Sequence, residues 1–161
     1  GGWAHENCYH AYESVLARRF GADVTITAIS GIGLVQNANA EQQWQLGALS
    51  MPAYFNRTLQ SAASPPWPLG DAADLVTVSL GGNDYNHQHG NVPSNATFTT
   101  AFARFAAHLL ARYAAPTPIL AVCGMGSPVE KQFDPDNNRC RPCAHVEAAV
   151  AALASPRVTY K

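Results

Sequence analysis

The feature that most constrains the fold is the apolar run at residues 75–80 (Leu-Val-Thr-Val-Ser-Leu), which ends abruptly in Gly81-Gly82-Asn83-Asp84. Such a run is typical of a buried strand, and two glycines with an Asn-Asp pair predict a tight loop directly after it. In open α/β sheets, ligands bind at the carboxyl ends of the strands. We therefore expect the chemistry of this chain at the loop after Leu80.

The other periodic segments alternate between strand and helix patterns. Further strands are predicted at residues 23–29, 118–122 and 157–160. Helices are predicted at residues 6–20 and at about 144–153, and residues 52–59 are predicted to be partly helical. A further helix is predicted where Phe98, Phe102, Phe105 and Leu109 form one apolar stripe. This alternation predicts a parallel sheet in a three-layer α/β/α sandwich.

Composition limits the class of protein. A chain of 161 residues with 47% hydrophobic residues suits one domain with a sizeable core. The formal net charge is −1, and no cluster of Lys and Arg occurs. These features disfavour a nucleic-acid or anionic-membrane surface, and no apolar run approaches the roughly 20 residues of a membrane span.

The cysteines and two Asn-x-Thr tripeptides predict a secreted or extracytoplasmic protein. Asn56 and Asn95 each begin an N-glycosylation acceptor pattern, and the cysteine count is even. Cys140 and Cys143 are expected to form a local disulfide or to pair with a cysteine outside the chain. Cys123 is expected to be a buried free thiol. A zinc or redox role for the Cys-x-x-Cys fits less well, because no second ligand pair is present.

The glycine loops, in their order along the chain, resemble two blocks of the SGNH (GDSL-type) hydrolases. The matching residues are Ser30-Gly31-x-Gly33 for block II and Gly81-x-Asn83-Asp84 for block III. The resemblance extends to the acetyl-xylan-type esterases of carbohydrate esterase family 2. There the chain matches at Glu6, Asn7, Tyr9, Ala11 and Tyr12, and again at Met51, Pro52, Arg57, Thr58, Leu59 and Trp67.

This resemblance implies that residues 1–161 form part of a serine esterase domain. The family carries its nucleophilic Ser in a Gly-Asp-Ser motif on the first strand and its base His in a C-terminal Asp-x-x-His block. Neither motif lies in these residues, so both are expected elsewhere, upstream and downstream or in a partner chain. The missing first strand would pair between residues 23–29 and 75–80, whose edges would otherwise lack a partner.

A serine esterase also needs donors aimed at the tetrahedral oxyanion, and the resemblance assigns these to Asn83 and Gly31. Asn83 would donate through its side-chain amide and Gly31 through its backbone N–H. Gly33, Gly82 and Asp84 are candidate substrate-binding residues, with Asp84 interpreted mainly as holding its loop through backbone amides. Taken alone, the residues Gly81 to Asp84 could simply form a turn, because Asn and Gly tolerate left-handed backbone conformations. The presence of a second glycine loop at residues 30–33 favours the oxyanion role. No metal or organic cofactor is required.

Other candidate residues have simpler interpretations. Ser30 falls at a structural serine of the family, and Ser79 is predicted to be buried in its strand. His87 and His89 could line the pocket or bind a metal, although two histidines without a third ligand are more often solvated. Surface or packing roles are predicted for His5, His10, His108 and His145. Sugar stacking or core packing is open for Trp3, Trp44 and Trp67.

The leading prediction is an SGNH-type esterase that removes acetyl groups from a carbohydrate. Its partners would be an acylated carbohydrate or another small ester and the remaining parts of the domain. The alternative is a non-catalytic domain of the same fold, with a structural or carbohydrate-binding role in a larger assembly. A flavodoxin-like binding module is less favoured, because no phosphate-cradling glycine loop precedes a helix.

Overall fold

The computed structural model describes residues 7–38, 49–57, 72–85, 92–123 and 142–161. Its elements, in chain order, are η2 (Cys8–His10, a 3₁₀ turn), α1 (Tyr12–Phe20), α3 (Met51–Tyr54), β1 (Val76–Leu80), α4 (Asn95–Arg112), β2 (Ile119–Cys123), α5 (Pro142–Leu153) and β3 (Val158–Tyr160). From β1 onward, the predicted alternation of strands and helices is confirmed, with ends that differ by one or two residues.

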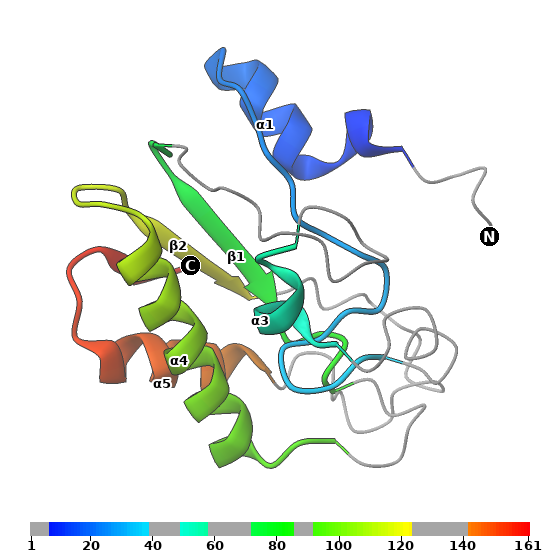
Figure 1. Cartoon of the computed structure of the whole chain (residues 1–161), viewed down its shortest axis with the longest axis vertical. Coiled ribbons are helices and arrows are strands. Elements are labelled where there is room, and N and C mark those ends of the chain that lie inside the picture. The colour runs from blue at the N-terminus through cyan, green and yellow to red at the C-terminus, as the bar shows by residue number, and fades with distance from the viewer. Residues whose placement is uncertain (1–6, 39–48, 58–71, 86–91, 124–141) are drawn as a thin grey trace.

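The three strands form a parallel sheet in the order β1-β2-β3 (Figure 1). Val76 pairs with Ile119 at the start of β1, and Ile119 pairs in turn with Val158 of β3. Parallel strands need long crossovers, and here α4 and α5 make them. All three strands therefore end at the same edge of the sheet, where the loop after Leu80 begins.

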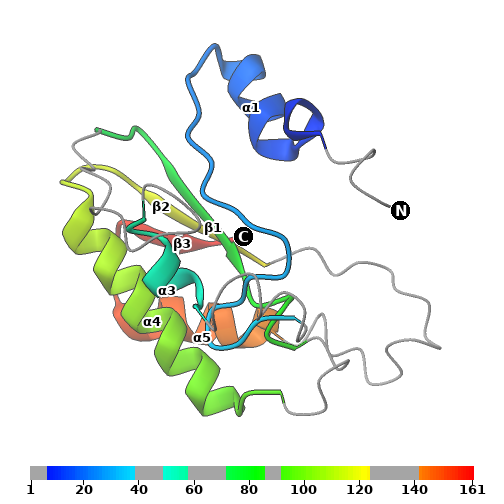
Figure 2. The ribbon, with the colours of Figure 1, turned by 45° about the vertical axis from the view of Figure 1, so that its right-hand side comes forward.

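The helices lie on both faces of the sheet, which confirms the predicted α/β/α arrangement. Helices α4 and α5 pack against each other and against β2 on one face, and α1 lies on the other side (Figure 2). Along β1, Val78 and Leu80 are buried, while Thr77 and Ser79 are exposed. The predicted burial of Ser79 is therefore wrong, because its side chain points to the thinly covered face.

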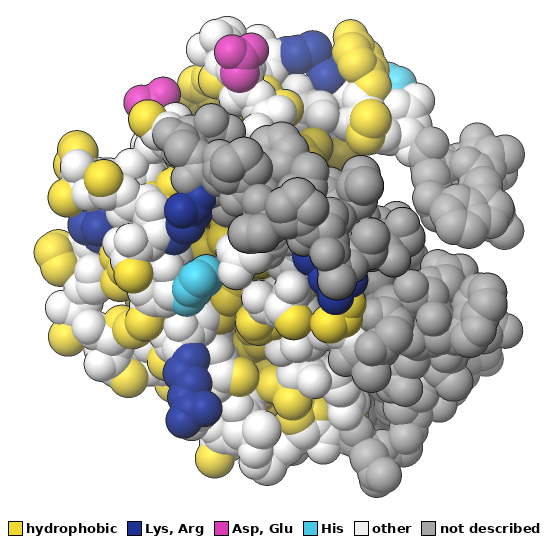
Figure 3. Space-filling model, in the orientation of Figure 1, with side chains coloured by type: hydrophobic (Ala, Val, Ile, Leu, Met, Phe, Trp, Pro, Cys, Tyr) yellow, Lys and Arg dark blue, Asp and Glu magenta, His cyan; other side chains and the backbone are white. Residues whose placement is uncertain are grey.

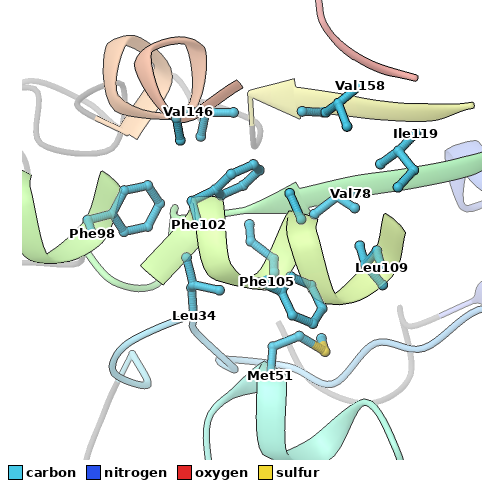
Figure 4. Close-up of a cluster of buried hydrophobic side chains, with 14 of the residues drawn as sticks. Leu34, Met51, Val78, Phe98, Phe102, Phe105, Leu109, Ile119, Val146 and Val158 are labelled. Atoms are coloured by element: carbon cyan, nitrogen blue, oxygen red, sulfur yellow. The ribbon is translucent and has the colours of Figure 1, made fainter. Parts of the chain in front are cut away.

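The core lies between the sheet and α4 (Figure 4). The predicted stripe of Phe98, Phe102, Phe105 and Leu109 is almost fully buried. This stripe packs against buried residues of the strands on one side and, on the other, against Leu34 of the 30–38 loop and Met51 at the start of α3. Burying a large side chain stabilises a fold by about 1.5–3 kcal/mol, so this stripe fixes α4 on the sheet.

Local signals set the ends of the helices. Helix α1 ends at Gly21, whose left-handed φ of 61° matches the predicted stop. Ser94 caps α4 by accepting a hydrogen bond from the Thr97 backbone N–H at 3.1 Å. Among the described helices, none is both long and apolar enough to cross a membrane.

The strand predicted at residues 23–29 is not formed. These residues run extended beside β1 in Figures 1 and 2, but they make no strand ladder, and Val24 and Ile26 are exposed at 46% and 39%. A strand needs a hydrogen-bonded neighbour. Within the described residues, the outer edge of β1 also has no strand partner.

The disulfide joins residues other than those predicted. Cys123, at the end of β2, is bonded to Cys143, in the first turn of α5, with Cα atoms 5.0 Å apart. The predicted Cys140–Cys143 pair and the free thiol at Cys123 are both wrong. The crossover from β2 to α5 returns the chain to the same sheet edge, so cysteines 20 residues apart meet there. Cys140 lies outside the described residues.

Candidate active site

Two loops meet at the carboxyl end of β1. One is Gly81–Tyr85, directly after the strand, and the other is residues 30–38, after the extended segment. Gly81 and Gly31 have φ angles of +117° and +77°, which L side chains rarely adopt. A Cβ on Gly81 would also lie 2.6 Å from Pro142 Cβ and 2.8 Å from Phe98 Cζ. Glycine is therefore needed where the loop passes close to α4 and α5.

Asp84 joins the two loops through its carboxylate. Its side chain is 0% exposed and accepts hydrogen bonds from three consecutive backbone N–H groups, at 2.9 Å (Leu34), 2.6 Å (Val35) and 3.1 Å (Gln36). Burial raises the pKa of Asp84 above its usual 3.8, and the backbone N–H groups act in the opposite direction. This geometry agrees with the interpretation of Asp84 as the residue that holds the loops.

Asn83 makes a second connection between the loops. Its side-chain Nδ2 donates at 2.7 Å to the carbonyl oxygen of Ile32, the residue that follows Gly31 in the chain. The Gln36 side chain donates in the reverse direction, from Nε2 to the Asp84 carbonyl oxygen at 2.9 Å. The structure thus brings Asn83 and Gly31, the two predicted oxyanion donors, to neighbouring positions.

The sequence analysis missed Asn37, which shapes the 30–38 loop from inside. It is 3% exposed; its Oδ1 accepts from the Gly33 N–H at 3.0 Å, and its Nδ2 donates to the Leu49 carbonyl at 2.9 Å. Gly33 in turn accepts from the Met51 N–H at 2.8 Å. No spacing distinguishes Asn37 from the other polar residues around it, so only its burial identifies the role.

The candidate substrate-binding residues differ in their surroundings. Gly33 is buried, and a Cβ there would overlap the Gln36 carbonyl oxygen and lie 2.9 Å from Asp84 Oδ2. Gly82 is half-buried, and a Cβ there would meet nothing within 4 Å. Gly33 is therefore required by the loop itself, whereas Gly82 has open space beside it.

The structure describes only some of the other candidate residues. Ser30 is exposed at the start of its loop. Among the described residues, no three His, Cys, Asp or Glu side chains lie together as a metal site would require. The predicted roles of His5, His87, His89, Trp3, Trp44 and Trp67 fall outside the described residues.

The fold and this loop pair define the chain as an α/β protein with a polar site at the carboxyl edge of a parallel sheet. The model of the GDSL-like lipase/acylhydrolase family matches residues 1–160. The chain belongs to that family.

Solved structures show the same fold. A family two carbohydrate esterase from Cellvibrio japonicus aligns with a TM-score of 0.77 and 22% identity over 96% of this chain and 42% of its own. A carbohydrate esterase family 2 enzyme from Corynascus thermopiles (Myceliophthora fergusii) aligns with a TM-score of 0.75 and 22% identity. This alignment covers 92% of the present chain and 45% of the enzyme. The Clostridium thermocellum family two carbohydrate esterase in complex with cellohexaose aligns with a TM-score of 0.70 and 21% identity. This alignment covers 98% of the present chain and 44% of the esterase.

These alignments confirm the predicted fold class. The chain spans less than half the length of each of these solved structures. No curated protein matches the chain.

Proposed function

We propose that this chain supplies the oxyanion-hole part of a serine esterase that removes acetyl or other acyl groups from a carbohydrate. The observation that carries the proposal is the pair of loops at the end of β1, where the Asn83 amide bonds the carbonyl of Ile32, the residue after Gly31. Family membership supports acyl hydrolysis, and the structural neighbours named as carbohydrate esterases support the substrate class.

The Asn83 amide can serve the fold and the reaction together. A side-chain amide has two N–H donors, and one of them bonds the Ile32 carbonyl at 2.7 Å. The hydrogen bond fixes the direction of the second N–H, which would donate to the oxyanion together with the Gly31 backbone N–H. Donors held in place before the reaction stabilise the developing charge without reorganising.

Substrate would contact the open side of this loop pair. A Cβ on Gly82 would meet nothing within 4 Å, so this residue leaves its side of the loop open to substrate. Asp84 and Gly33 are enclosed by the loops, so they would act by holding the backbone at the site. The reaction uses side chains and backbone only, without a metal or organic cofactor.

The nucleophilic serine and the base histidine would come from the remaining parts of the domain or from a partner chain. A strand that carries the serine would fit between residues 22–29 and β1, where Val24 and Ile26 are exposed and the outer edge of β1 has no strand partner among the described residues. Parallel pairing there would bring the end of the new strand to the edge where Asn83 and Gly31 lie.

We also propose a secreted or extracytoplasmic location. The Cys123–Cys143 disulfide is of the kind that persists in oxidising compartments. Of the two glycosylation acceptors, Asn95 is exposed at the first turn of α4, and Asn56 is half-buried. Asn95 is therefore the more accessible candidate for modification.

The test is hydrolysis of an aryl acetate and an acetylated oligosaccharide by the native-length protein and by Asn83→Ala. We expect kcat to fall by about 10²- to 10³-fold with a smaller change in KM, because the lost donor acts mainly in the transition state. The matched control is Gln36→Ala, which removes a different side-chain hydrogen bond between the same loops. Its kcat should stay within a few-fold of the wild type.

Two outcomes would contradict the proposal. Equal rates for the wild type and Asn83→Ala would remove the oxyanion role from Asn83. A wild-type protein that hydrolyses neither ester would favour the non-catalytic, carbohydrate-binding alternative.

A further inference from the structure

We propose that a groove along the exposed side of α4 binds a carbohydrate that carries a carboxylate, such as a glycan with a uronic-acid unit. The inference rests on the proposed function, since it names the class of carbohydrate whose ester would reach the oxyanion hole. The α4 groove consists of two hollows of about 560 Å³ and about 290 Å³, which share Ala101 and Arg104.

The α4 groove borders the loop at residues 30–38, one of the two loops of the candidate active site. Leu34 and Val35 of this loop line the larger hollow, and their backbone N–H groups bond the Asp84 carboxylate. Ser50 also lines the larger hollow, and the N–H of its neighbour Met51 donates to the Gly33 carbonyl at 2.8 Å. A chain of sugars that leaves the oxyanion loops in this direction would enter the groove.

The lining of the larger hollow has the mixture that carbohydrates require. Hydroxyl groups come from Ser50, Thr97 and Thr100, and apolar surface comes from Val35, Ala96 and Ala101. Small-molecule sites commonly combine apolar walls with a few placed polar groups. Hydroxyls can bond the sugar hydroxyls, while the apolar walls cover the C–H face of the ring.

Arg104 gives the groove its preference for an anion. It is exposed, it borders both hollows, and none of the described residues provides it with a carboxylate partner. In Figure 3, the coloured acidic side chains lie in the upper part of the view, and none is seen over α4. A planar guanidinium can bind a carboxylate through two parallel hydrogen bonds, which suits a uronic acid.

His108 adds an aromatic ring to the lining of the groove, further along α4. It lies four residues after Arg104, so both side chains are on one helix face, and it lines the smaller hollow with Pro52 and Phe105. Its ring stacks on Phe105, with centroids 6.5 Å apart and planes at 18°. Phe105 is buried beneath it, so the surface beside the cationic side chain comes from the outer face of the His108 ring and from Pro52.

The test compares two ligands that differ in one group. Calorimetric titrations of the native-length protein at pH 7 would use cellotriose and the same trisaccharide with one glucose oxidised to glucuronic acid. We expect the wild type to bind the acidic sugar about fivefold more tightly, the ratio expected of one partly exposed ion pair. The preference should decrease as salt is added, because exposed charges are screened.

Variants separate the charge from the shape of the groove. Arg104→Gln should abolish the preference and leave the affinity for cellotriose nearly unchanged, whereas Arg104→Lys should keep part of the preference. Arg19→Gln changes an exposed arginine on α1, outside the groove, and should keep all of it. Equal wild-type affinities, no binding of either sugar, or a preference that survives Arg104→Gln would each overturn the proposal.

The titrations do not depend on ester hydrolysis, so the two proposals can fail separately. A protein that prefers the acidic sugar but hydrolyses no ester would refute the esterase and keep the groove. An active esterase without the preference would refute the groove alone.

Discussion

At the scale of single residues, the candidate site depends on a buried carboxylate that has hydrogen bonds but no cationic partner among the described residues. Asp84 accepts three backbone N–H groups, and this arrangement satisfies donors in a loop that forms no regular structure. Hydrogen bonds to a charged group contribute about 1.5–3 kcal/mol, against a desolvation cost of similar or greater size. The raised pKa indicates that desolvation is the larger effect.

The pH dependence of stability should reveal this balance. Because the folded-state pKa of Asp84 lies above 3.8, the native state holds its proton to higher pH than the unfolded state does. The contribution of Asp84 to the free energy of unfolding is therefore greatest below pH 3.8 and declines as pH rises through the raised pKa. The stability difference between wild type and Asp84→Asn should decline in the same interval, by about 1.4 kcal/mol for each pH unit between the two pKa values.

Urea unfolding of both proteins between pH 3 and pH 7 would measure this difference. Asp74→Asn, which changes an exposed aspartate before β1, controls for the effect of net charge. A difference that grows with pH would instead show that the three backbone N–H groups lower the pKa of Asp84 below 3.8.

At the scale of elements, Arg157 connects the end of α4 to the starts of two strands. Its guanidinium donates to the carbonyls of Thr117 at 2.9 Å and Tyr113 at 2.7 Å, with longer bonds to Leu110 and Ala114. Thr117 precedes β2, and Arg157 itself precedes β3. One side chain therefore satisfies carbonyl groups at the helix end that have no further helical donor.

Replacing Arg157 should destabilise the fold at the end of the sheet remote from the candidate site. We expect Arg157→Met to lower the free energy of unfolding by about 2–3 kcal/mol, because it leaves several half-buried carbonyls without donors. Arg157→Lys should recover little of this loss, since an ammonium group cannot reproduce the planar arrangement of donors. Denaturant unfolding would measure both, and a Lys variant as stable as wild type would show that charge alone matters.

At the scale of the whole molecule, the described residues cover one side of the sheet incompletely. Exposed large hydrophobic residues gather on α1, the segment after it and the start of β1: Tyr9, Tyr12, Leu16, Phe20, Val24, Ile26 and Leu75. Ser79 of β1 lies near the Tyr12 hydroxyl, whose pKa is raised by burial and by Glu13 and lowered by Ser79. Contiguous apolar surface of this kind marks a site of interaction.

Hydrogen exchange should show what covers this side. If a further strand lies between residues 22–29 and β1, backbone amides of residues 24–28 should be protected in the native-length protein and exchange freely in residues 1–161 alone. The amides of α4 serve as the internal control, because their helical hydrogen bonds exist in both cases. Free exchange at residues 24–28 in the native-length protein would contradict the inserted strand.

Much of the fold could be predicted because its signals are local. The apolar stripe of α4, the β-branched run of β1 and the stop at Gly21 all lie within short windows of sequence, and each is present in the structure. The segment at 23–29 has the same β-branched signal but forms no strand, because pairing depends on a neighbour that is distant in sequence. Asn37 has no local signal at all.

The sequence by itself determined the helices and strands from β1 onward, and it placed Asn83 in a loop at the end of a strand and Gly31 in a glycine loop, because periodicity and glycine chemistry are properties of neighbouring residues. Only the tertiary structure decided that Asp84 bonds three amides about 50 residues away and that Cys123 pairs with Cys143. Those contacts depend on the parallel crossovers, which return distant segments to one edge of the sheet, and no short window of sequence encodes that meeting.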